Sequence, residues 1–115
     1  MAALGVSAGF TAPARAGERF ACEMHALSAA ERARHHALLT ELIGSVVDKR
    51  ELADGYGFRF APQQLPKVAE WIGFERRCCP FFTFDLAVAR DSGPLWLEVR
   101  GSDGVKDFIR GEFGL

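Results

Sequence analysis

The sequence lacks an excess of charge of either sign, and it lacks long apolar runs. Its 115 residues hold 14 Lys and Arg against 15 Asp and Glu, so the formal net charge is −1. A protein without a net positive field does not attract a nucleic-acid backbone or an anionic membrane strongly. Charged residues interrupt every apolar stretch before the ~20 residues that a membrane-spanning helix needs. We therefore expect no nucleic-acid partner and no membrane association.

Cysteine is scarce, and its number is odd. Three cysteines do not make the paired framework that is typical of small secreted domains. We therefore predict a cytoplasmic protein whose thiols are free, metal-bound or transiently oxidised. The familiar catalytic motifs are also missing: there is no Gly-rich phosphate loop, no G-x-S-x-G, no H-E-x-x-H and no cluster of acidic ligands. The sequence thus indicates no organic cofactor.

The start of the chain differs in composition from the remainder. Residues 1–18 are rich in Ala and Gly, contain no early Lys or Arg, and have their apolar residues separated by Gly5 and Gly9. This pattern departs from a secretory leader, and we expect a flexible N-terminal arm over residues 1–18. Residues 19–115 contain no linker or repeat, and they predict a single domain.

The hydrophobic pattern of this domain alternates between the strand and helix periods. Ser28 and Glu31 form a capping box that begins a helix, which we expect to fade near Val47 before a charged turn. Pro80 ends a second helix, because a proline disfavours the helical conformation in the residue before it. Further segments complete the prediction: strands at 19–26, 52–60, 81–90 and 95–100, the second helix from 62–66 onward, and a last helix after Asp103.

These elements follow one another in the order β-α-β-α-β-β-α. That order predicts an α+β fold, a two-layer sandwich in which a mixed four-stranded sheet carries its helices mainly on one face.

Adjacent cysteines at a helix end are the most informative feature of the sequence. Cys78 and Cys79 lie in the segment E-R-R-C-C-P-F-F. The guanidinium groups of Arg76 and Arg77 favour thiolates, whereas the partial negative charge of a helix C-terminus opposes them. A disulfide between neighbouring residues would be strained. The pair is therefore expected to share a partner rather than to bond to itself.

Cys22 is the natural third thiol. In a strand over residues 19–26, Cys22 shares a face with Phe20 and Met24 and points towards the layer of the second helix, while His25 points the other way. Three thiolates suit a soft ion, namely mercury(II), arsenic(III), copper(I) or zinc. Zinc would need a fourth ligand. We therefore predict a metal site of Cys22, Cys78 and Cys79, whose partner is a metal ion or a small thiol-reactive molecule.

Two other interpretations stay open. In the first, Cys78 or Cys79 is the nucleophile of a thiol-based enzyme that performs thiol exchange or cleaves a carbon–metal bond, with Glu75 or Asp85 moving a proton. In the second, the cysteines are inert core residues of an interaction module that forms a homodimer through an exposed sheet edge.

The remaining titratable residues near these motifs have simpler expectations. His35 and His36 are adjacent on the first helix and diverge by about 100°, so they cannot chelate one ion well. We expect both to lie on the helix surface. Glu75 is expected to form a surface ion pair with Arg76 or another arginine.

The segments E-R-R-C-C-P-F-F-T-F, G-P-L-W-L-E-V-R-G and G-V-K-D-F-I resemble a family of small, largely uncharacterised bacterial proteins. In that family a helix ends with E-R-x-C-C-P-F before a hairpin and a short C-terminal helix. The likeness covers about residues 19–113, and Cys22, Glu75, Cys78, Cys79 and Pro80 match its pattern. Such proteins are associated with bacterial mercury- and metal-resistance genes, so the resemblance implies soft-metal binding.

Overall fold

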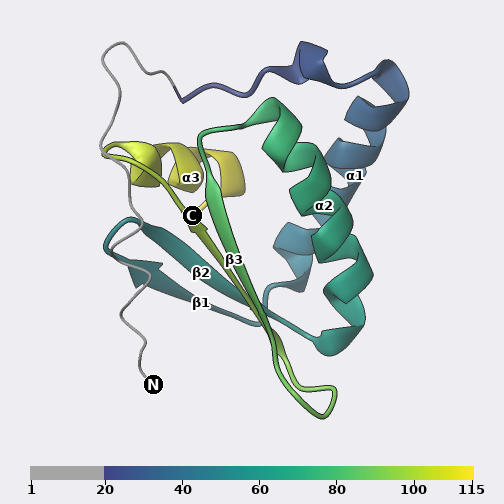
Figure 1. Cartoon of the computed structure of the whole chain (residues 1–115), viewed down its shortest axis with the longest axis vertical. Helices are drawn as coiled ribbons and strands as arrows, with labels where there is room; N and C mark the ends of the chain where they lie inside the picture. Colours follow the sequence, from purple (N-terminus) through teal and green to yellow (C-terminus); the bar gives the residue numbers. More distant parts are fainter. Residues whose placement is uncertain (1–19) are drawn as a thin grey trace.

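The computed structural model describes residues 20–115 (Figure 1). The arm predicted over residues 1–18 lies outside this range. The described elements are the short 3₁₀ turn η2 (Met24–Ala26), α1 (Ala29–Ser45), β1 (Asp48–Leu52), β2 (Gly55–Phe60), the 3₁₀ turn η3 (Pro62–Gln64), α2 (Leu65–Cys78), β3 (Thr83–Val88), β4 (Leu95–Arg100) and α3 (Val105–Phe113).

The four strands form one sheet in the order β1-β2-β4-β3. The predicted α+β class and the four-stranded sheet are confirmed. All three strand pairings are antiparallel, so the sheet is not mixed as the sequence had suggested. The hairpin between β1 and β2 is tight, and its first residue in β2 lies very close to β4. A Cβ atom on Gly55 would lie 1.9 Å from the carbonyl oxygen of Val99 on β4, so only glycine fits there.

Two segments differ from their predicted structure. Residues 48–51, expected to form a charged turn, belong to the edge strand β1. Charged side chains are common on edge strands because they discourage pairing with other chains. The charge of these residues therefore did not distinguish an edge strand from a turn. Residues 19–26, expected to be a strand, contain the turn η2 instead. The Glu23 amide donates to the carbonyl of Cys78 on α2, 2.6 Å away, rather than to a sheet neighbour.

The helices cover one face of the sheet, which makes the molecule a two-layer sandwich (Figure 1). Phe58 of β2 contacts Phe113 of α3, with ring centroids 5.6 Å apart. Trp71 of α2 contacts Phe84 of β3, with centroids 5.8 Å apart. Phe58 is paired with Leu97 of β4, and Phe84 is paired with Val99, two residues further along the same strand. Since alternate residues of a strand face opposite sides, both rings lie on one face, and α2 and α3 pack on that face.

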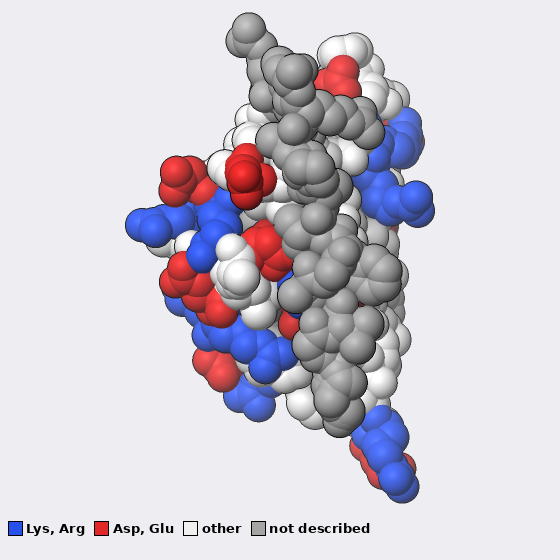
Figure 2. Space-filling view, turned by 60° about the vertical axis from the view of Figure 1, so that its left-hand side comes forward, with Lys and Arg blue, Asp and Glu red and all other residues white. Residues whose placement is uncertain are grey.

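The opposite face of the sheet carries charged side chains. The Arg50 guanidinium lies 4.0 Å from the ring centroid of Trp96, and Arg100 forms ion pairs with Asp85 and Glu98. Acidic and basic residues are also interspersed over the described surface in Figure 2, in keeping with the near-neutral composition.

Within residues 20–115, no helix has the length and apolar character needed to cross a bilayer.

Local signals explain where the helices begin and end. The Ser28 hydroxyl accepts from the Glu31 amide at 3.1 Å, and the Ser28 amide donates to the Glu31 carboxylate at 2.9 Å. The capping box predicted for α1 is thereby confirmed. Helix α2 ends at Cys78, immediately before Cys79 and Pro80. This end of α2 lies beside the segment that leads into α1, and the two together form the candidate site.

Candidate thiol and metal site

The three cysteine sulfurs converge at the C-terminal end of α2. Cys22 and Cys79 form a disulfide with an S–S distance of 2.02 Å and a Cα–Cα distance of 4.7 Å. The Sγ atom of Cys78 lies 3.7 Å from that of Cys79. The predicted proximity of all three sulfurs is confirmed, since every pair lies within 4.8 Å. Cys78 is the free cysteine, and its bonding to a metal remains a prediction.

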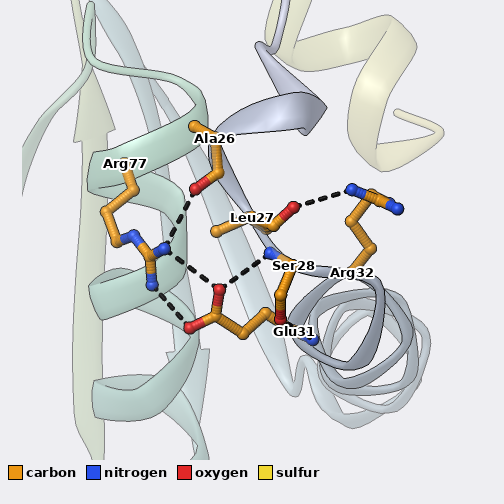
Figure 3. Close-up of polar contacts among 6 residues, drawn as sticks. All are labelled: Ala26, Leu27, Ser28, Glu31, Arg32 and Arg77. Atoms are coloured by element: carbon orange, nitrogen blue, oxygen red, sulfur yellow. Dashed lines mark hydrogen bonds and ion pairs between the residues drawn. The ribbon is translucent and has the colours of Figure 1, made fainter.

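Non-covalent contacts also hold the Cys22 segment in place (Figure 3). Arg77 of α2 donates to the carbonyl of Ala26 at 2.9 Å and to both carboxylate oxygens of Glu31, at 2.8 and 3.0 Å. Arg32 donates to the carbonyl of Leu27 at 2.7 Å. These contacts join the segment before α1 to both helices, in addition to the hydrogen bond from Glu23 to Cys78.

Aromatic rings provide a further link between the two sides of the site. The Phe20 ring, two residues before Cys22, lies 5.3 Å from that of Phe81, two residues after Cys79. Both rings also contact Phe108 of α3, with centroid distances of 6.5 and 5.3 Å. The segments that carry Cys22 and Cys79 are therefore joined by aromatic contacts as well as by their covalent bond.

A buried histidine–glutamate pair lies next to Cys78. The Nε2 atom of His35 on α1 is 2.6 Å from the Oε2 atom of Glu75 on α2. The two residues are only 4% and 1% exposed. The predictions of a surface histidine and of a surface ion pair between Glu75 and an arginine are therefore wrong. His36, in contrast, is exposed as expected.

Helical spacing contained the signal for this pair. His35 precedes the buried residues Leu38 and Leu42 by three and seven positions, which places it on the same face of α1. Glu75 occupies the equivalent place on α2, between Trp71 and Cys78. Because both side chains are polar, they were expected on the surface. A polar residue on a buried face needs a hydrogen-bond partner, and the sequence of one helix does not show which residue of another helix supplies it.

The electrostatic surroundings keep Cys78 protonated. Burial raises the pKa of the Cys78 thiol to about 11, and the nearby Glu75 carboxylate adds to this effect. Arg77 opposes the shift only weakly, and its guanidinium is hydrogen-bonded to Glu31. The pKa of Glu112 on α3 is also raised, first by burial and then by Glu75. The charges of Glu75 and Glu112 thus both act against ionisation of the Cys78 thiol.

Two sets of metal-ligating atoms overlap at this site. The first is Cys22, Cys78 and Cys79, and the second is His35, Glu75 and Cys78. Within each set, the ligand atoms lie within 4.8 Å of one another. Nε2 of His35 is 4.0 Å from Sγ of Cys78. Cys78 is the residue that the two sets share.

Asp85, the other acidic residue considered as a proton carrier, does not belong to this site. Its side chain is 51% exposed and pairs with Arg100, at 3.3 Å, on the charged face of the sheet. Of the two predicted proton carriers, the structure therefore brings only Glu75 to the cysteines.

An apolar cavity of about 430 Å³ lies elsewhere in the sandwich, and Leu42, Phe58 and Phe113 are among its lining residues. Neither the cysteines nor the His35–Glu75 pair line it.

Comparisons of the chain with protein-family models, with curated proteins and with solved structures found no match.

Proposed function

We propose that the reduced protein binds a soft, thiophilic metal ion through Cys22, Cys78 and Cys79 and acts in the sequestration or delivery of that ion. Mercury(II), arsenic(III) and copper(I) suit three thiolates directly, whereas zinc would need a fourth ligand. The resemblance to bacterial proteins associated with mercury and metal resistance agrees with this proposal.

The observation that carries the proposal is the proximity of all three cysteine sulfurs. Hydrogen bonds and aromatic contacts, in addition to the disulfide, hold the Cys22 segment against the end of α2. When the disulfide is reduced, the sulfurs of Cys22 and Cys79 must separate to a non-bonded distance, close to the 3.7 Å that already divides Cys78 from Cys79. With metal–sulfur bonds near 2.3 Å, the sulfurs of a trigonal site lie about 4 Å apart. Reduction alone therefore brings the sulfurs near the spacing that a bound ion requires.

Burial adds to the stability of such a complex. Cys78 and Cys79 are fully buried, which shields metal–sulfur bonds from water and from competing thiols. Each thiol loses its proton on binding, and the pKa of about 11 for Cys78 means that this proton is present at neutral pH. Affinity should therefore fall on acidification.

The test compares mercury(II) with arsenite on the protein in two redox states. Reduced wild-type protein should bind one equivalent of either ion, measured by native mass spectrometry and by ultraviolet thiolate-to-metal absorption. Mercury(II) is satisfied by two thiolates, so Cys22→Ser should retain mercury but lose arsenite. The disulfide form of the wild-type protein is the matched control, and it should bind no arsenite. Unchanged mercury affinity and stoichiometry in the Cys78→Ser/Cys79→Ser variant would refute the proposal.

Thiol–disulfide exchange is a second candidate, because Cys78 lies 3.7 Å from a disulfide sulfur. In this reaction the Cys78 thiolate would attack Sγ of Cys79, a Cys78–Cys79 disulfide would form, the bond from Cys79 to Cys22 would break, and Cys22 would leave as a thiolate that takes up a proton. The product is a disulfide between neighbouring residues, which is strained. A pKa of about 11 leaves little Cys78 thiolate at neutral pH, which favours metal binding over exchange. With glutathione added as the reductant, catalysis by wild type of the reduction of a small disulfide, lost in Cys78→Ser, would reverse this order.

A further inference from the structure

The His35–Glu75 pair has no part in the three-thiolate site, yet both residues are buried beside it. A buried imidazole and a buried carboxylate are costly to desolvate unless they bind each other or a third group. Here they bind each other at 2.6 Å, and His35 also lies 4.0 Å from the Cys78 sulfur. An imidazole nitrogen, a carboxylate oxygen and a thiol sulfur thus face one another at the packed surface between α1 and α2.

We propose that His35, Glu75 and Cys78 form a second metal site, of mixed donors, that is available while Cys22 and Cys79 are joined as a disulfide. The chemical class of its ligand is a borderline divalent cation such as Zn²⁺, which accepts nitrogen, oxygen and sulfur donors in tetrahedral geometry. The three side chains supply three positions. The fourth would be taken by water or another small ligand.

The distances require only small adjustments. Zinc bonds of about 2.0 Å to nitrogen and oxygen and about 2.3 Å to sulfur set tetrahedral separations of roughly 3.3 Å for N···O and 3.6 Å for N···S. The observed values are 2.6 Å for His35 Nε2 to Glu75 Oε2 and 4.0 Å for His35 Nε2 to Cys78 Sγ. Each separation changes by less than about 1 Å on binding, which side-chain torsions can absorb.

In the metal-free protein, a hydrogen bond joins two of the three proposed ligands. Whichever partner holds it, one proton lies between Nε2 of His35 and Oε2 of Glu75, because a hydrogen bond joins them. A divalent ion would displace this proton, either to solvent or to Nδ1 of the same ring, and would release the thiol proton of Cys78 to solvent.

Because both sites need Cys78, the state of the disulfide decides which ion the protein can hold. In the disulfide form, the sulfurs of Cys22 and Cys79 are not thiolates, and the mixed site alone remains. After two-electron reduction by a dithiol, which is itself oxidised to a disulfide, three thiols become available, and a soft ion that displaces their protons takes Cys78 into the first set. This exchange of ions rests on the proposed function, whereas the mixed site stands without it.

Cobalt(II) is the probe for the mixed site because its visible spectrum reports both geometry and sulfur ligation. The disulfide form of the full-length wild-type protein should bind one cobalt(II), with tetrahedral ligand-field bands and a sulfur-to-cobalt charge-transfer band, and zinc(II) should displace it. X-ray absorption at the cobalt edge should show one sulfur with nitrogen and oxygen neighbours. Absence of binding, or binding without sulfur, would overturn the mixed site.

Variants separate the mixed site from the three-thiolate site. His35→Gln removes a proposed ligand and should lower cobalt affinity by more than the roughly hundredfold that loss of an outer-shell partner can cost, while the reduced variant still binds arsenite. His36→Gln, which changes the exposed neighbour, should leave both ions unaffected. The reduced Cys22→Ala/Cys79→Ala variant should lose arsenite and retain cobalt. Equal cobalt affinity in His35→Gln and wild type would overturn the mixed site alone, whereas failure of reduced wild type to bind arsenite would overturn the proposed function alone.

Discussion

At the scale of single residues, Cys78 determines the chemistry of the site. It is the last residue of α2, it is fully buried, and it belongs to both sets of metal-ligating atoms. Burial and the Glu75 carboxylate raise the pKa of its thiol to about 11. This environment makes Cys78 a poor nucleophile in the absence of metal, while a bound cation would compensate for the loss of its proton.

The titration of the Cys78 thiol should follow this pKa. In the disulfide form Cys78 is the free thiol, and the NMR chemical shift of its Cβ atom reports on it alone without the solvent access that a buried side chain lacks. The shift should change with a midpoint near pH 11, and in the same protein unfolded in urea with its disulfide intact the midpoint should lie near the ordinary value of ~8.5. The shifts are measured by NMR across pH. A native midpoint below pH 8.5 would instead indicate an activated thiol and would favour the enzymatic interpretation.

At the scale of elements, the end of α2 and the start of α1 are joined through Glu31 and Arg77 (Figure 3). Glu31 belongs to the capping box of α1 and also binds Arg77 of α2. The hydrogen bond from Arg77, with help from the Ser28 amide, lowers the pKa of Glu31 to about 2. Residues 22–28 are thereby held against both helices, which positions Cys22.

Loss of the cap should destabilise α1. Ser28→Ala should lower the free energy of unfolding by about 1 kcal/mol, measured by urea denaturation. Ser45→Ala is the control, because the Ser45 hydroxyl donates to the Glu41 carbonyl at the other end of the same helix. It should change stability less. Equal effects of the two substitutions would contradict the importance of the capping box.

The charge of Glu31 can be separated from its capping role with Glu31→Gln, since glutamine also serves in a capping box. The pKa of Glu31 is lower in the folded protein than its ordinary 4.5. Its charge therefore stabilises the fold fully above pH 4.5, and this contribution disappears as the pH falls towards 2. The variant should be less stable than wild type at pH 7, and the difference should shrink at pH 3. A difference that is constant with pH would show that the ion pair with Arg77 has no part in stability.

At the scale of the whole molecule, the disulfide encloses more than half of the described residues. Cys22 and Cys79 are separated by 57 positions, and between them lie α1, β1, β2 and α2. Such a cross-link stabilises mainly by limiting the unfolded chain. The hydrogen bonds and aromatic contacts around Cys22 act in the folded state, so we expect them to persist when the disulfide is reduced.

Reduction should therefore weaken the fold without abolishing it. A loop of this length corresponds to roughly 4 kcal/mol of unfolding free energy, and urea denaturation with and without a phosphine reductant measures the loss. Cys78→Ala is the control, and its stability should respond to reductant as wild type does. If reduction unfolds the protein at neutral pH in the absence of metal, the three-thiolate site cannot be pre-formed as proposed.

The amino-acid sequence by itself determined those features that depend on neighbours within a few positions. The capping box of Ser28 and Glu31 begins α1, Pro80 follows the end of α2, and β4 spans the predicted residues 95–100. Hydrogen bonds between residues three positions apart and the fixed backbone of proline act locally. The helix ends that they produce can therefore be predicted from the sequence. The α+β class follows from the same alternation of periods.

Only the tertiary structure decided which distant residues meet. The sequence indicated that Cys22 joins the adjacent cysteines, but it did not reveal that Cys22 bonds to Cys79 and leaves Cys78 free. The pairing of His35 with Glu75, 40 positions apart, was equally hidden. A helical face shows that a residue is buried but not what lies opposite. That depends on how α1 packs against α2, and packing is set by the shape of the whole core rather than by either helix alone.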